Sequence, residues 1–196
     1  MHEPAGGGAD TAWHLHIATM NDADQGNTWF DATKLTTNGT GAHNTSYQPK
    51  RIQFGGYKTS NEFSKCEVAE FITFARVLSE EERLKVEGYL AHKWGATDSL
   101  PGSHPYKDIA PSFDNSPVLT MVPGVQGFDT PTREGLLGEW LFDDGTANDT
   151  SGNNYHGLNN GGAFVTETPS GTGQAIDLSG NKYVSVDDGQ GVLSIC

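Results

Sequence analysis

The stretch Gly135–Gly157, GLLGEWLFDDGTANDTSGNNYHG, decides how the rest of the chain is interpreted. Its short apolar run, LLGEWLF, leads into an acidic turn and then into a loop rich in Gly and Asn, a pattern typical of the opening of a β-domain. This opening begins about two-thirds of the way along a chain of 196 residues. The chain therefore holds a whole domain, parts of two neighbouring domains, or one domain with its segments in inverted order.

The composition indicates an acidic, β-rich protein. Asp and Glu number 25 against 12 Lys and Arg, a net charge of −13, so the chain repels polyanions and we expect no nucleic-acid partner. The 25 Gly and a hydrophobic share of 35% favour short strands and turns over a helical bundle. We expect no membrane span because no apolar run approaches the roughly 18 residues required. Residues 1–12 also lack the basic and apolar regions of a signal peptide, so we expect none in this chain.

Four strands are predicted in the first part of the chain, one of them a hairpin strand around Thr28 to Phe30. WHLHIA, residues 13–18, alternates strictly, with its apolar side chains on one face and His14 and His16 on the other. KRIQFGGY, residues 50–57, predicts a second strand. CEVAEFITFARVL, residues 66–78, is apolar on both faces, which predicts a central strand of a sandwich.

One helix is predicted over residues 79–94. Ser79 can cap its first turn, and Glu82, three positions later, completes a capping box. An apolar side chain recurs at every fourth position from Val86 to Trp94, and the glycine that follows can adopt the left-handed conformation that ends a helix. The helix is therefore expected to pack through one apolar stripe.

The composition changes after this helix. Residues 96–134 contain six of the nine prolines and show no sustained periodicity, which predicts a linker. Residues 135–196 return to short strands separated by Gly, Asn and Asp turns, and the chain stops inside the last of them, VLSIC.

Two parts of the chain resemble the same family. AEFITFARVLSEEERLKVEGYLAHKWG, followed by LPGSHPYK, resembles the closing strand, helix and exit of LamG-like, concanavalin A-like (lectin/glucanase) jelly-roll domains found in large bacterial secreted or surface proteins. GLLGEWLFDDGTANDTSGNNYHGLNNGG, followed by GQAIDLSGNKYVSV, resembles the opening strands of that family. WHLHIATMN is similar to its middle W-H-x-I-A strand, although the family more often carries adjacent histidines there.

The resemblance implies an all-β fold, a concanavalin A-like jelly-roll sandwich with one short helix. Residues 1–95 correspond to the C-terminal half of such a domain and residues 135–196 to the N-terminal half, so the chain appears as the end of one repeat joined to the start of the next. We therefore expect a circularly permuted or domain-swapped sandwich, the latter a homodimer formed by strand exchange. The resemblance also implies an extracellular or cell-surface parent protein.

A cation site is predicted in the acidic loop. Asp143, Asp144, Asn148 and Asp149 surround a glycine, the oxygen-rich and flexible setting that calcium uses. The resemblance implies a structural calcium ion near this loop, with an acidic ligand from the closing strand, and Glu70 fits that role. The alternative is that these side chains only form turns and that Glu70 pairs with a Lys or Arg.

The paired histidines offer a second candidate site. His14 and His16 lie on one face of the predicted strand about 7 Å apart, a spacing that can chelate zinc or manganese and leave a catalytic position open. That arrangement predicts a metal-dependent hydrolase with weak, promiscuous ester or phosphoester cleavage. The residues considered as a third ligand are His43, His92, His156, Asp22 and Asp24. The alternative is that both histidines are solvent-facing or stacking side chains.

Aromatic residues in polar contexts suggest carbohydrate binding. Trp29, Tyr47, Tyr57 and Tyr155 could stack on sugar rings, with local packing as the alternative for each. The sequence contains no G-x-S-x-G elbow, Walker loop or dinucleotide loop. The predicted function is therefore a calcium-stabilised binding or adhesion module for glycans or glycoproteins, with the hydrolase and a structural spacer domain as alternatives.

Overall fold

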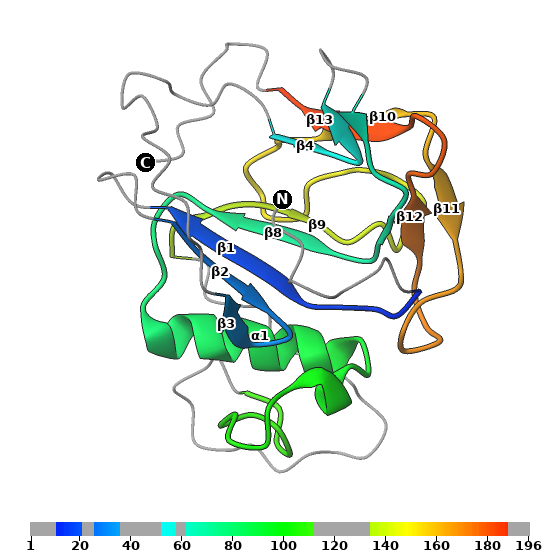
Figure 1. The fold of residues 1–196 in the computed structure, drawn as a ribbon. Helices are drawn as coiled ribbons and strands as arrows, with labels where there is room; N and C mark the ends of the chain where they lie inside the picture. Colours follow the sequence, from blue (N-terminus) through cyan, green and yellow to red (C-terminus); the bar gives the residue numbers. More distant parts are fainter. Residues whose placement is uncertain (1–10, 21–25, 36–51, 58–61, 112–133, 188–196) are drawn as a thin grey trace. The chain divides into compact units, whose positions relative to one another are not determined.

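The structure, a computed structural model, describes residues 11–20, 26–35, 52–57, 62–111 and 134–187. The chain divides into two compact units. The first comprises residues 1–41 and 77–133, and the second comprises residues 42–76 and 134–196. Figure 1 shows the described elements of both units along the chain.

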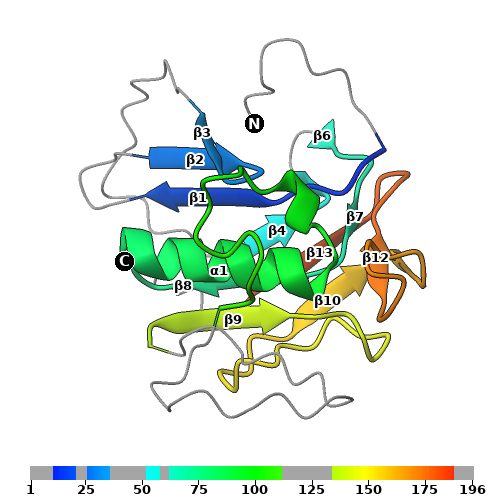
Figure 2. The same cartoon turned by 90° about the horizontal axis from the view of Figure 1, so that it is seen from below.

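The first unit contains a three-stranded antiparallel meander, in which β1 (His16–Met20), β2 (Gly26–Phe30) and β3 (Thr33–Leu35) lie side by side (Figure 2). The strand predicted at residues 13–18 begins later, at His16. The reason is the β2–β3 turn, where Asp31 and Ala32 both have positive φ, 47° and 57°. Asp31 bonds the backbone of Leu15 there through both its own N–H and its carboxylate, so Leu15 is held by a turn and not by a strand.

The predicted helix is confirmed as α1 (Glu80–Lys93). Ser79 caps it, its hydroxyl accepts the Glu82 N–H, and the Glu82 carboxylate accepts the Ser79 N–H in return. Gly95 follows with φ 67°, as the left-handed stop requires. The buried face differs from the predicted stripe, because Arg83 and Glu87 are buried along with the apolar residues.

The first part of the predicted linker is ordered on the helix. Residues 96–111 include the 3-10 helix η1 (Thr97–Ser99), and Leu100 beyond it is only 2% exposed. The Lys107 ammonium donates to three backbone carbonyls near η1, those of Thr97 at 2.7 Å, Leu100 at 2.9 Å and Asp98 at 3.2 Å. These bonds hold the two ends of the segment together. The remainder of the predicted linker, residues 112–133, lies outside the described residues.

The second unit is built from short antiparallel strands of two distant segments. The earlier segment contributes β4 (Ile52–Phe54), β5 (Gly56–Tyr57), β6 (Glu62–Phe63), β7 (Glu67–Val68) and β8 (Phe71–Phe74). The later segment contributes β9 (Leu136–Trp140), β10 (Gly157–Asn160), β11 (Ala163–Val165), β12 (Ala175–Asp177) and β13 (Tyr183–Val186). Three ladders join the segments, β13 to β4, β12 to β7 and β9 to β8, which is the expected pairing of early and late strands.

These ladders belong to small sheets. The strand orders are β10-β13-β4, β11-β12-β7, β5-β6 and β8-β9. The single strand predicted over residues 66–78 is instead two strands, β7 and β8, separated at Ala69 and Glu70. The break follows from the pairing, because β7 joins β12 while β8 joins β9. Within the described residues β8 has one strand neighbour, so the prediction of a central position is not met.

The core of the second unit combines aromatic side chains from both segments. Trp140 is fully buried, and Phe71 lies opposite it in the β8–β9 ladder with ring centroids 5.8 Å apart. Phe54 packs on Phe71 at 4.9 Å. Gly138 is required beside them, because a Cβ atom there would lie 2.3 Å from the Trp140 ring. The described residues thus form mostly antiparallel β-structure with one α-helix, as the all-β prediction requires.

Candidate functional site

Asp149, predicted as a cation ligand, organises the acidic loop through hydrogen bonds to protein groups. Its Oδ1 accepts the backbone N–H groups of Glu139 at 3.0 Å and Ser151 at 2.8 Å. Its Oδ2 accepts the Ser151 hydroxyl at 2.8 Å and the Tyr155 N–H at 3.0 Å. The residue is 7% exposed, so one buried carboxylate ties strand β9 to the loop that follows it.

The hydrogen bonds to Asp149 also affect the pKa of its carboxyl group. Burial alone would raise the pKa of its carboxyl, but the bonds donated by Glu139, Ser151 and Tyr155 outweigh burial and hold the pKa below its ordinary value. The carboxylate is therefore stabilised in its charged form by backbone donors. Both Asp149 carboxylate oxygens therefore accept hydrogen bonds from protein groups in the absence of a cation.

Two other acidic-loop carboxylates also bind backbone N–H groups, Asp144 within its own turn and Asp143 in a distant segment. Asp143 accepts the Gln174 N–H at 3.0 Å, and Asp144 accepts the Thr146 N–H at 2.9 Å and the Thr146 hydroxyl at 2.6 Å. The Asn148 N–H donates to the Thr146 hydroxyl oxygen at 3.2 Å. Asp143, Asp144 and Asn148 are exposed, so their side chains are presented on a loop whose backbone is fixed from within.

The predicted ligand set does not converge in the described part of the chain. Glu70 is half-buried and lies in the break between β7 and β8, outside any strand. Within the described ranges, no group of three or more His, Cys, Asp or Glu side chains is placed to hold a metal ion. The residues predicted for calcium therefore do not form a ready cation site.

Glu139 was not predicted, and it is the most unusual carboxylate of this unit. It is 2% exposed, and its Oε2 accepts the Thr150 hydroxyl at 2.8 Å. Its Oε1 is buried and has no hydrogen-bond partner among the described residues. Burying a carboxylate oxygen without a hydrogen-bond donor or a cation beside it costs folding free energy. The signal in the sequence was an acidic residue inside the apolar run LLGEW.

His14 and His16 form an aromatic cluster with Phe30. The ring centroids lie 4.5 Å and 4.8 Å from that of Phe30, and His14 Nδ1 pairs with Asp31 Oδ2 at 2.8 Å. Burial chiefly, and then the neighbouring His14, lowers the pKa of His16, while Asp31 works in the opposite direction. These contacts match the stacking alternative for the two histidines.

The residues considered as a third metal ligand are dispersed. The His92 imidazole donates from Nε2 to the Tyr106 carbonyl at 2.9 Å, and His156 Nδ1 accepts the Asp149 N–H at 3.1 Å. His43, Asp22 and Asp24 lie outside the described residues. Each described candidate thus has a structural hydrogen bond of its own.

The aromatic residues predicted for sugar stacking also have packing roles where they are described. The Trp29 ring lies 4.5 Å from the Arg83 guanidinium and 5.7 Å from the Lys34 ammonium. Tyr155 packs on the core of the second unit. Tyr57 is in β5, its side chain is not described, and Tyr47 lies outside the described residues.

No family model matches the chain, and no curated protein or solved structure matches it. In the part of the chain that the structure describes, no helix is both long enough and apolar enough to cross a membrane.

Proposed function

We propose that this chain is a non-catalytic binding or adhesion module for glycans or glycoproteins, built as a LamG-like, concanavalin A-like jelly-roll sandwich. The observation that carries the proposal is the pairing of β13 with β4, β12 with β7 and β9 with β8. In the β8–β9 ladder, a strand from the stretch that resembles the close of the family pairs with a strand from the stretch that resembles its opening. A permuted sandwich needs this arrangement.

The loop between β9 and β10 supports a binding role. Asp149 fixes its backbone from within, so the loop can present side chains at little cost in conformational entropy on binding. Exposed carboxylates and amides of this kind suit the hydroxyl groups of sugars. The exposed carboxylates and amides of this loop are Asp143, Asp144, Asn148, Asn153 and Asn154.

Glycan binding is tested by retention of the whole chain in gels containing soluble neutral polysaccharides, and by binding to immobilised mucin. We expect retention by at least one of these, and we expect Asn148→Ala combined with Asp144→Ala to abolish it. Glu80→Ala, an exposed change in the first turn of α1, is the control that retains binding. If none of the glycans binds, the module proposal fails and the spacer alternative takes its place.

We also propose that calcium stabilises this module near residues 143–149, as the family resemblance implies. Because both Asp149 oxygens already accept hydrogen bonds, Glu139 is the residue whose buried charge a cation would balance. Binding to the folded state alone stabilises it by about 3–4 kcal/mol when calcium exceeds Kd by about 100- to 1,000-fold. Chelation should therefore lower Tm, and Glu139→Gln should remove that response. An unchanged Tm on chelation would refute the calcium proposal.

One observation favours the hydrolase as a second candidate. The contact between His14 and Asp31 is of the kind that orients metal-ligating histidines through their other ring nitrogen. Elemental analysis of the purified protein tests it directly. Stoichiometric zinc or manganese that is lost in His16→Ala would support the hydrolase, and their absence would leave the two histidines as packing residues.

A further inference from the structure

Strand β9 has different neighbours on its two sides. β8 pairs with it on one side, and in the described part of the chain no second strand pairs with it on the other. Residues 149–153 occupy that other side, and an isolated antiparallel bridge joins Trp140 to Asp149 there. This segment of the loop therefore lies where a further strand of the sheet would pair.

The loop bonds both backbone groups of Glu139. The Glu139 N–H donates to Asp149 Oδ1 at 3.0 Å, and the Glu139 carbonyl accepts the N–H of Thr150 at 2.8 Å. In an antiparallel sheet, the N–H and C=O groups of successive residues point alternately to the two neighbouring strands. The loop thus satisfies the donor and the acceptor that β9 would offer to a second strand at this residue.

Asn153 covers the beginning of the same strand. Its Nδ2 donates to the carbonyl of Leu136 at 2.8 Å and to that of Leu137 at 3.0 Å. The backbone N–H of Asn153 donates to the Ser151 hydroxyl oxygen at 3.2 Å. The Ser151 hydroxyl in turn donates to Asp149 Oδ2 at 2.8 Å, so the position of Asn153 is tied to the buried carboxylate. One amide side chain therefore occupies two adjacent carbonyls of β9.

Without this cover, β9 would be open to pairing with another chain. Sheet edges with unpaired N–H and C=O groups recruit further strands, and proline and lysine are common devices against such pairing. The strand LLGEW, residues 136–140, contains neither. Antiparallel pairing of two copies about Gly138 would place Glu139 of each copy opposite Leu137 of the other, so no like charges would meet. A second copy of this chain therefore fits the uncovered edge.

We propose that residues 149–153 form a strap that closes the edge of β9 and keeps a second copy of this chain from adding a strand there. The strap acts through groups that bond the β9 backbone, namely the Thr150 N–H, the Asp149 carboxylate and the Asn153 amide. This role does not depend on glycan binding, which is tested through Asp144 and Asn148. Either proposal can therefore fail without the other.

The test compares self-association of the whole chain and of Asn153→Ala by sedimentation velocity over a range of protein concentrations. The change frees the carbonyls of Leu136 and Leu137, so we expect the dissociation constant for self-association to fall by about tenfold or more. Adding Leu136→Lys should reverse this fall, because a lysine at a strand edge opposes strand addition. Asn148→Ala, an exposed change in the same loop, is the matched control and should associate like the unchanged protein.

The strap is overturned if Asn153→Ala unfolds cooperatively but associates no more than the unchanged protein. Stronger association that Leu136→Lys does not reverse would overturn it as well. A second measurement needs no variant and applies even if Asn153→Ala does not fold. Hydrogen exchange of the unchanged protein should protect the Glu139 amide as strongly as the β9 amides that face β8. A Glu139 amide that exchanges near its intrinsic rate would show that the edge is open.

Discussion

Val184 lies opposite Phe54 in the antiparallel β13–β4 ladder, and both side chains are buried in the same core. The two residues belong to segments that the helix and the residues after it separate in sequence. Neither segment of the second unit therefore completes its ladders or its core alone. The long loop closed by this pairing is tolerable, because closure cost grows only as about (3/2)RT ln n.

The second unit should not fold from either of its two segments alone. Residues 1–110 and residues 130–196, expressed separately, each lack the partner strands of the other, so their edges and core faces remain open. We expect residues 130–196 alone to show little β-structure by circular dichroism, and the mixture of the two pieces to show more β-structure than the sum of the separate pieces. A cooperative unfolding transition in residues 130–196 alone would contradict the shared ladders.

Asp149→Ala should be strongly destabilising. It leaves the buried N–H of Glu139 and the half-buried N–H of Tyr155 without an acceptor, at about 1–3 kcal/mol each, so we expect a loss of roughly 2–6 kcal/mol in urea unfolding. Asp144→Ala, an exposed change in the same loop, is the control and should cost less than about 1 kcal/mol. Equal effects of the two changes would show that Asp149 is not the organising residue.

The contribution of Asp149 should also depend on pH in a defined direction. Its pKa is lowered in the folded state, so the stabilisation is fully present above the unfolded value of about 3.9 and is lost as the pH falls through the lower folded pKa. The stability difference between the unchanged protein and Asp149→Asn should therefore be constant above about pH 5 and shrink below about pH 4. If the stability difference between the two proteins instead widens as the pH falls, the pKa of Asp149 is not lowered in the folded state.

Gly88→Ala should destabilise the first unit, although alanine is the better helix former. The added Cβ atom overlaps Tyr106, which must move or leave its seat on α1. In a Tyr106→Gly background the overlap disappears, and the same change should stabilise the helix by up to about 1 kcal/mol. A double-mutant cycle of thermal unfolding measures this reversal, and additive effects would mean that the two residues do not touch.

His16→Ala should change stability by less than about 1 kcal/mol, because the His16 side chain is only partly removed from solvent and contacts the Phe30 ring through its edge. Asp31→Ala should cost more, since Asp31 binds both His14 and the Leu15 N–H. Thermal unfolding ranks the two variants. The stacking interpretation fails if His16→Ala instead removes an esterase or phosphoesterase activity that the unchanged protein has.

The sequence predicted best what is decided locally. The cap at Ser79, the reciprocal Glu82 and the stop at Gly95 act within one or two turns, and all three are found in the structure. Strand boundaries were predicted less well, because they depend on which distant residues form hydrogen bonds with the strand backbone. The strand after Trp13 begins late because Asp31, distant in sequence, takes the backbone of Leu15.

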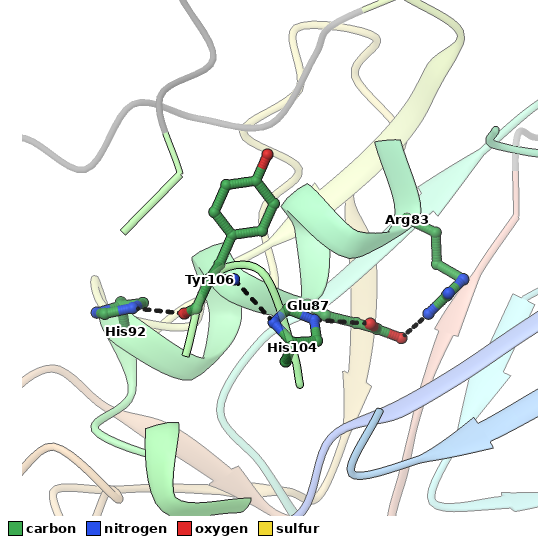
Figure 3. A network of polar contacts seen from close by, with 5 residues as sticks. All are labelled: Arg83, Glu87, His92, His104 and Tyr106. Atoms are coloured by element: carbon green, nitrogen blue, oxygen red, sulfur yellow. Dashed lines mark hydrogen bonds and ion pairs between the residues drawn. The ribbon is translucent and has the colours of Figure 1, made fainter. Parts of the chain in front are cut away.

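The candidate sites could not be predicted to the same degree. Asp149 has the side chain of a calcium ligand and also that of a turn-forming residue, and only its four donors distinguish the two roles. Arg83 and Glu87 lie outside the apolar stripe predicted for α1, yet both are buried, because Glu87 binds Arg83 and also His104 (Figure 3). Hydrogen-bond partners that are distant in the sequence cannot be identified from the sequence of a single chain.

The most direct test of the account is a disulfide across the β13–β4 ladder. Gln53 and Ser185 are register partners, and antiparallel partners have Cα atoms about 4.5–5.5 Å apart, within disulfide reach. In a Cys66→Ser, Cys196→Ser background, Gln53→Cys with Ser185→Cys should oxidise rapidly, within one chain or between two exchanged chains. Gln53→Cys with Leu158→Cys is the control, because Leu158 lies in the same row but one strand further away, on β10. Faster oxidation of the 53–185 pair is the predicted result; equal rates for the two pairs would contradict the pairing of the two segments.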